Sequence, residues 1–218
     1  MNRVVVLACC AVLFTFAAAD SQKDDEKRFK KCNDITEDIY KYEVETLTGE
    51  KISLGKFRGK TLLIVNVATF CGYTEQYLDF NGLMTRNSGV QLLAFPCNQF
   101  LMQEPGNNSE ILNGLKYVRP GNNWTPNDSV HILGKLEVNG AAEHPLYTFL
   151  KNNCPGTTET IGKRASLFYD PVKTTDVTWN FEKFAIDKRG RPRFRFHPAA
   201  WQKGKMVEQF LQTLVAEE

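Results

Sequence analysis

The chain has 218 residues, which is enough for one domain with a sizeable core. It carries 27 Lys or Arg and 25 Asp or Glu. This near balance gives no indication of nucleic acid or an anionic membrane as a partner.

The first residues are typical of a secretory signal peptide. Arg3 precedes an apolar stretch over residues 4–19, which ends in three alanines. We expect residues 1–19 to be removed and the protein to be secreted into an extracellular space. A membrane anchor is the alternative, but the stretch is marginal for spanning a bilayer and a charged segment follows at once. No later stretch is long and apolar enough to form a membrane span.

After the signal, we expect a charged, solvated N-terminal segment over residues 20–35 and one domain over residues 36–218. The first predicted element is a strand or hairpin at residues 42–47. Residues 62–68 form a short, β-branched apolar run, which predicts a buried strand.

The following elements predict a βαβ unit with parallel strands. Apolar residues at helical spacing occupy residues 77–84, and residues 90–95 form a second apolar run. A polar region follows, interrupted by a short helix at residues 110–116, and another helix is predicted at residues 144–151.

The last part of the chain predicts a hairpin and a closing helix. Strand patterns at residues 179–186 and 192–196 flank a turn, and residues 206–215 carry an amphipathic stripe. A βαβ unit followed by a hairpin and a helix is the thioredoxin-like arrangement. We therefore predict an α/β, thioredoxin-like fold with a central mixed sheet flanked by helices.

Four cysteines remain after the signal: Cys32, Cys71, Cys97 and Cys154. Their pairing cannot be deduced from spacing, and no CxxC motif is present. Cys71 lies where the strand at residues 62–68 leads into a helix, and ligands collect at such strand ends. The helix dipole there favours a thiolate, which a peroxide can oxidise to sulfenic acid. A buried core cysteine is the alternative.

Four motifs, at residues 66–74, 95–100, 103–105 and 179–184, resemble the glutathione peroxidase family. The resemblance runs from about Tyr42 to the C-terminus. It implies an antioxidant oxidoreductase of the oxidative stress response whose catalytic tetrad is Cys71, Gln99, Trp179 and Asn180. Amide and indole N–H groups of the last three would stabilise the thiolate and the leaving peroxide oxygen. Alternatively, Trp179 is a core aromatic residue and Gln99 a surface loop residue.

The resemblance also implies a reaction. Cys71 would become a sulfenic acid, glutathione would form a mixed disulfide with it, and a second thiol would release the enzyme. Glutathione is then a co-substrate, and no metal, flavin or haem cofactor is expected. Arg119, Arg193 and Arg195 are candidates for binding its carboxylates, although a solvated hairpin face would also carry such residues. Gln76 stands where cytosolic relatives carry an arginine.

Two alternatives stay open. Cys97 could resolve the sulfenic acid as an internal disulfide, which a thioredoxin would recycle; a structural thiol is the default. A non-catalytic secreted protein that uses the fold as an interaction surface is the second alternative. The sequence also differs from the family after Phe100, because Leu101 and Met102 follow where relatives usually carry a glycine.

The polar region carries features of assembly and modification. Residues 115–121 resemble the tetrameric family members, and the signal peptide resembles that of the plasma-like branch. The resemblance implies a homotetramer that prefers hydrogen peroxide and soluble organic hydroperoxides. Three sequons predict a glycoprotein, with acceptors at Asn107, Asn123 and Asn127.

Overall fold

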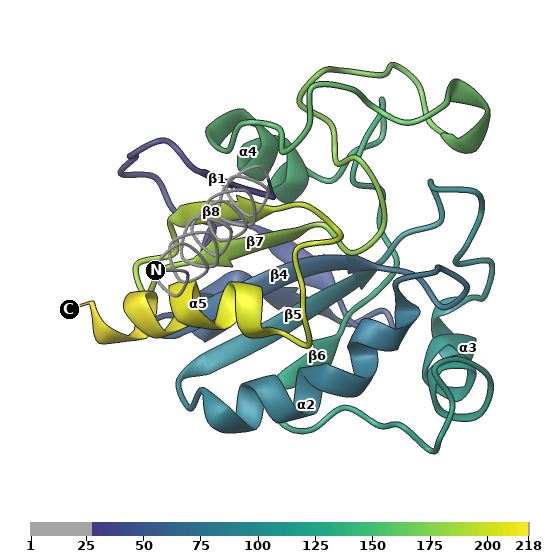
Figure 1. The fold of residues 1–218 in the computed structure, drawn as a ribbon, viewed down its shortest axis with the longest axis horizontal. Coiled ribbons are helices and arrows are strands. Elements are labelled where there is room, and N and C mark those ends of the chain that lie inside the picture. Colours follow the sequence, from purple (N-terminus) through teal and green to yellow (C-terminus); the bar gives the residue numbers. More distant parts are fainter. Residues whose placement is uncertain (1–27, 218) are drawn as a thin grey trace, which may run out of the picture.

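The computed structural model describes residues 28–217. The expected signal peptide and the first half of the charged segment, residues 20–27, lie outside these residues. A mixed six-stranded sheet in the order β1-β8-β7-β4-β5-β6 forms the centre (Figure 1). Its strands are β1 (Phe29–Lys31), β4 (Thr61–Val67), β5 (Val90–Pro96), β6 (Val130–Ile132), β7 (Lys183–Ile186) and β8 (Pro192–Phe196). The predicted fold class is confirmed.

The central strand β4 decides where the site lies. All seven of its residues are buried, because layers cover both faces of the sheet. It runs parallel to β5, with Val67 opposite Pro96, and antiparallel to β7. Since β4 and β5 end level with each other, the loops that follow them meet at one edge of the sheet.

Two hydrophobic clusters pack on the two faces of the sheet. One joins the sheet to α2 (Tyr77–Arg86) and α5 (Lys205–Ala216), which lie over the front face in Figure 1. The other joins it to α4 (Pro145–Asn153) and to the separate hairpin of β2 (Glu43–Glu45) and β3 (Lys51–Ser53). The short helices are η1 (Leu54–Phe57), η2 (Thr74–Gln76), α3 (Asn108–Asn113), the π-helical turn η3 (Gly114–Val118) and η4 (Arg164–Ser166).

The structure differs from the sequence prediction at the N-terminal segment. Residues 29–31, expected to be solvated, form β1 and pair with β8. The reason is aromatic packing, because the Phe29 ring lies 4.6 Å from the Phe210 ring on α5. One residue further on, Cys32 forms a disulfide with Cys154 at the end of α4.

Smaller differences concern boundaries. The strand predicted from residue 179 begins at Lys183, because residues 179–181 form a turn. Strand β6 was not predicted. No helix within residues 28–217 is both long and apolar enough to cross a membrane.

Candidate active site

Cys71 follows β4 and lies three residues before η2, which continues into α2. Its side chain is buried, and the Tyr73 N–H donates a hydrogen bond to Sγ at 3.4 Å. The Cys71 N–H donates to Thr74 Oγ1 at 3.1 Å, which fixes the turn. A Cβ added to Gly72 would meet no atom within 4 Å, so space remains beside the thiol. The strand-to-helix position predicted for Cys71 is confirmed.

Trp179 and Asn180 lie on the turn between Val177 and β7, at the same edge of the sheet. Trp179 and Tyr73 both line a cavity of about 340 Å³, which places Trp179 close to the Cys71 turn. The indole Nε1 has no hydrogen-bond partner among the described residues. Asn180 is fully buried, and its Nδ2 donates to Gln103 Oε1 at 2.9 Å.

Gln99 does not take the predicted place in the tetrad. Its Nε2 donates to the Asn139 carbonyl at 2.8 Å, and its Oε1 accepts from the N–H groups of Val138 and Asn139 at 2.9 and 3.0 Å. Both ends of the amide are therefore committed to the loop at residues 137–139. Gln99 is a buried structural residue, so its predicted catalytic role is wrong.

Gln103 occupies the position expected of the tetrad glutamine. Its carbonyl accepts from the Phe70 N–H at 2.9 Å, next to Cys71, and its side-chain oxygen accepts from Asn180. Its Nε2 makes no hydrogen bond within residues 28–217, so this donor is available to a reacting group. The signal for it was in the sequence, since Gln103 begins the third family motif.

The loop that carries Gln103 has an unusual backbone. Leu101 and Met102 have φ values of 50° and 49°, the left-handed region that favours glycine. Their side chains are half exposed. Leu101 and Met102, which stand where relatives usually carry a glycine, therefore add conformational strain to this loop and apolar surface near the site.

Glu104 ties the loop of Gln103 to the chain before Cys71. Its Oε2 accepts from the Thr69 N–H at 2.9 Å and from Thr69 Oγ1 at 3.1 Å. Burial raises the pKa of this carboxyl, and the bonds from Thr69 partly oppose that rise. Glu104 therefore joins the two loops that hold Gln103 and Cys71.

The three arginines predicted to bind substrate have different surroundings in the structure. Arg195 is fully buried, pairs with Glu182 and donates to the carbonyls of Cys154, Thr175 and Asp176. Arg193 pairs with Asp187 at 3.3 Å and with Glu217. Both guanidinium groups are held in ion pairs, and Arg195 is in addition fully buried, so the structure gives no support to their predicted role in substrate binding.

Arg119 differs from the two hairpin arginines. It lies half exposed after η3, and it forms no ion pair within residues 28–217.

Cys97 is poorly suited to resolve a sulfenic acid. Burial raises the pKa of its thiol to about 12, and its Sγ–H donates to Gln99 Oε1 at 3.5 Å. It packs in the cluster of α4, whereas Cys71 packs in the cluster of α2 and α5. The sheet therefore separates the two thiols, which contradicts the alternative with Cys97 as resolving cysteine and leaves the structural role.

The three sequon asparagines differ in exposure. Asn107 and Asn123 are exposed. Asn127 is half buried, its Nδ2 donates to the Asn81 carbonyl at 3.2 Å, and its Oδ1 accepts from the Ser129 N–H. A glycan on Asn127 would have to displace these bonds.

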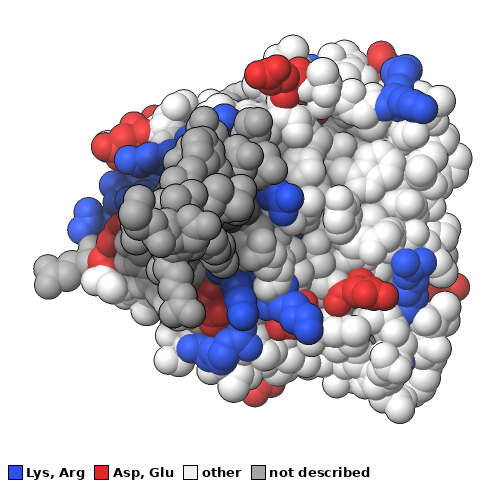
Figure 2. Space-filling model, in the orientation of Figure 1, with Lys and Arg blue, Asp and Glu red and all other residues white. Residues whose placement is uncertain are grey.

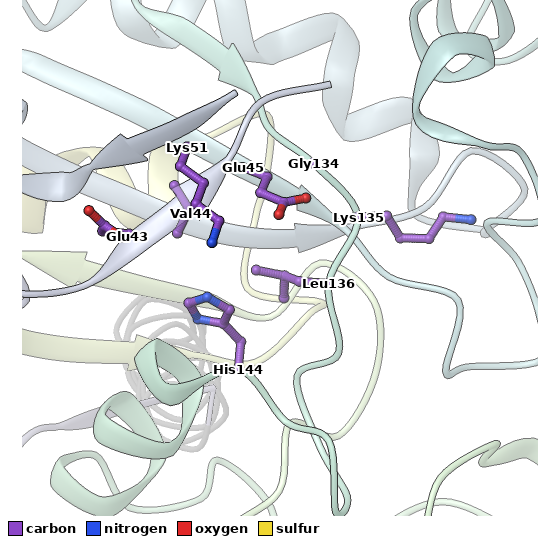
Figure 3. Close-up of a pocket in the computed structure, with 8 residues that line it drawn as sticks. All are labelled: Glu43, Val44, Glu45, Lys51, Gly134, Lys135, Leu136 and His144. Carbon is purple, nitrogen blue, oxygen red and sulfur yellow. The ribbon is translucent and has the colours of Figure 1, made fainter. Parts of the chain in front are cut away.

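A second cavity, of about 300 Å³, lies away from Cys71. It is lined by the β2–β3 hairpin, residues 134–136 and His144, as Figure 3 shows. None of the predicted site residues lines it. Among the described side chains, no group of three or more His, Cys, Asp or Glu residues could hold a metal ion.

Charge on the surface is sparse toward the strand ends. In Figure 1, the arrowheads of β4 and β5 point toward the right, and Figure 2 shows mostly uncharged side chains there. Lysine and arginine occur there together with acidic residues instead of forming one basic surface.

The chain is similar to several known proteins. A sequence model described as "Glutathione peroxidase" matches residues 39–151. "Glutathione peroxidase 3" of Caenorhabditis elegans is 50% identical over 99% of this chain and 97% of its own length. "Cuticular glutathione peroxidase" of Wuchereria bancrofti is 54% identical over 100% of both chains. The crystal structure of T. cruzi GPX1 superposes with a TM-score of 0.57 and 31% identity, covering 82% of this chain and 97% of that one.

Proposed function

The chain belongs to the glutathione peroxidase family, and from this premise we propose that it is a secreted enzyme that reduces hydrogen peroxide and soluble organic hydroperoxides with glutathione. Its enzyme class is thiol-dependent peroxidase. The observation that carries the proposal is the Cys71 thiol at the end of β4, with the Tyr73 N–H directed at its sulfur and the Trp179–Asn180 turn at the same sheet edge.

The first step transfers one oxygen atom to sulfur. The Cys71 thiolate attacks one peroxide oxygen, the O–O bond breaks, and a proton from solvent converts the leaving oxygen to water or an alcohol. The Tyr73 N–H, the Trp179 Nε1–H and the Gln103 Nε2–H groups are donors that stabilise negative charge at this position. Cys71 is left as a sulfenic acid.

Two thiols complete the cycle. The first condenses with the sulfenic acid, releasing water and forming a mixed disulfide. The second attacks that disulfide, so that an oxidised thiol pair leaves and the Cys71 thiolate returns. The proposed reaction uses no metal, flavin or haem.

Glutathione as the reductant is supported by the family and by the names of the relatives. Arg119 is the remaining candidate among the three predicted arginines for one of its carboxylates.

Secretion is supported by the sequence and by chemistry. The Cys32–Cys154 disulfide suits an oxidising compartment, and one relative is named cuticular. Asn107 and Asn123, which are exposed, are the favoured glycan acceptors; Asn127 remains a weaker candidate.

A homotetramer is supported by exposed apolar side chains on α3 and η3. Leu112, Tyr117 and Val118 are 44%, 64% and 64% exposed. Large apolar side chains gathered on one surface segment are typical of an interface. We propose that this segment contacts a second copy of the chain.

The test compares wild type with Cys71→Ser. Purified wild-type protein should consume hydrogen peroxide with glutathione, and Cys71→Ser should not. Consumption at only the background rate by both proteins would support the non-catalytic interaction protein instead, and equal consumption above background would contradict the role of Cys71. A parallel assay with thioredoxin and thioredoxin reductase separates the reductants, and faster turnover there than with glutathione would contradict the proposed co-substrate.

A further inference from the structure

A fully buried asparagine interrupts the apolar sequence of β4. Asn66 lies between Val65 and Val67, and its exposed fraction is 0%. Burying an amide costs about 1–3 kcal/mol unless it is hydrogen-bonded. Such a residue in a central strand therefore requires specific partners.

All four polar groups of Asn66 contact the turn that carries Trp179 and Asn180. The side-chain Nδ2 donates to the Trp179 carbonyl at 3.0 Å, and Oδ1 accepts from the Glu182 N–H at 3.1 Å. The backbone carbonyl accepts from the Phe181 N–H at 2.6 Å, and the backbone N–H donates to the Glu182 carbonyl at 3.4 Å. These bonds bracket Asn180 on both sides.

The turn itself is strained and held from a second direction. Phe181 has a φ of 66°, which a large side chain adopts only where its surroundings enforce it. Glu182 Oε2 accepts from the N–H and Oγ1 of Thr178, both at 2.7 Å, while Oε1 pairs with the buried Arg195. The conformation of the turn thus depends on Asn66 on one side and on Glu182 on the other.

We propose that Asn66 is a positioning residue for the peroxidase reaction. It joins the strand that leads to Cys71 to the turn that presents Trp179 and Asn180, and so fixes the donors relative to the sulfur. Because β4 carries both Asn66 and the connection to Cys71, one rigid element sets both halves of the site. This inference rests on the proposed function of Cys71, Trp179 and Asn180.

The test uses Asn66→Asp and Asn66→Ala, with the rate of Cys71 oxidation by hydrogen peroxide in a single turnover. Asn66→Asp keeps the shape and one acceptor but removes the donor to the Trp179 carbonyl. Misplacing a catalytic group by about 1 Å costs up to roughly 100-fold, so we expect a loss of about 10- to 100-fold for either variant.

A matched control separates positioning from folding. Asn87 is also buried, and its Nδ2 donates to the Leu83 carbonyl and to Glu208, both at 2.8 Å. Asn87→Ala should lower the melting temperature comparably but leave the peroxide rate at the wild-type value. Equal rate losses in Asn87→Ala and Asn66→Ala would overturn the proposal.

A double-mutant cycle distinguishes a positioning role of Asn66 from a purely structural one. Combined with Trp179→Phe, Asn66→Asp should cost much less than it does alone, because the donor that it positions is already gone. Losses that simply multiply, or a wild-type rate in Asn66→Asp, would refute the inference. Inactive Cys71→Ser beside active wild type establishes the proposed function independently of either result.

Discussion

Replacing Gln99 and Gln103 separately by alanine should give two different defects from the same chemical change. Gln99 makes three hydrogen bonds of 2.8 to 3.0 Å to the backbone at Val138 and Asn139. At about 1 kcal/mol for each bond, Gln99→Ala should lose about 3 kcal/mol of stability. For a chain of this size, that lowers the melting temperature by roughly 6–12 °C.

Gln103→Ala should show the opposite pattern. Its side chain makes one hydrogen bond, to Asn180, so the stability loss is about 1 kcal/mol. Removing one donor from a site where negative charge develops costs about 100-fold or more in rate. We therefore expect a large fall in the rate of Cys71 oxidation.

Stopped-flow measurement of thiol loss after mixing with hydrogen peroxide, together with thermal unfolding by circular dichroism, checks both variants. Each serves as the control for the other. The reasoning is refuted if Gln99→Ala unfolds as the wild type does and loses the peroxide step, or if Gln103→Ala retains the wild-type rate.

Three further predictions address stability and the reductant. The Cys32–Cys154 disulfide closes a loop of 122 residues, so Cys32→Ser with Cys154→Ser should lose up to about 4–5 kcal/mol in guanidinium unfolding; an unchanged midpoint would contradict this. Burial raises the pKa of Glu104 in the folded protein. Between the ordinary carboxyl pKa and this raised pKa, the folded protein keeps the Glu104 proton and the unfolded chain has lost it. The free energy of unfolding therefore falls as pH rises through this range. Glu104→Gln has no proton to lose at this position, so only the wild type loses stability across this pH range. The melting temperature of the variant minus that of the wild type should therefore increase with pH, and a constant difference would contradict this prediction. Arg119→Glu should raise the KM for glutathione and leave single-turnover oxidation by peroxide unchanged, and an unaltered KM would exclude Arg119 as a carboxylate ligand.

The main strands and helices were predictable because their apolar patterns have a clear period. Strand β4 and helix α2 lie within two residues of their expected ends at all four boundaries. Strand β1 was not predictable, because three residues with two lysines form a strand only through pairing with β8 and packing against Phe210. Such contacts between distant residues leave no local pattern.

The site was predictable in part. Cys71 follows a strong strand signal, and the Trp179–Asn180 pair stands in a specific motif. The choice between two glutamines four residues apart required the hydrogen bonds of Asn180 and Asn139, which the sequence does not contain. The role of Arg195 was hidden for the same reason, since a charged residue in a hairpin gives no sign that its partner, Glu182, is buried.

The pairing of β1 with β8 also has a consequence for synthesis. The first strand of the sheet joins an edge that is made by the last hairpin of the chain. A chain that emerges from its N-terminus first cannot seat β1 until nearly all of it has been made. Cys32, which directly follows β1, can therefore reach its final position only after β8 has been made. The sheet gains its β1 edge strand only when the chain is almost complete.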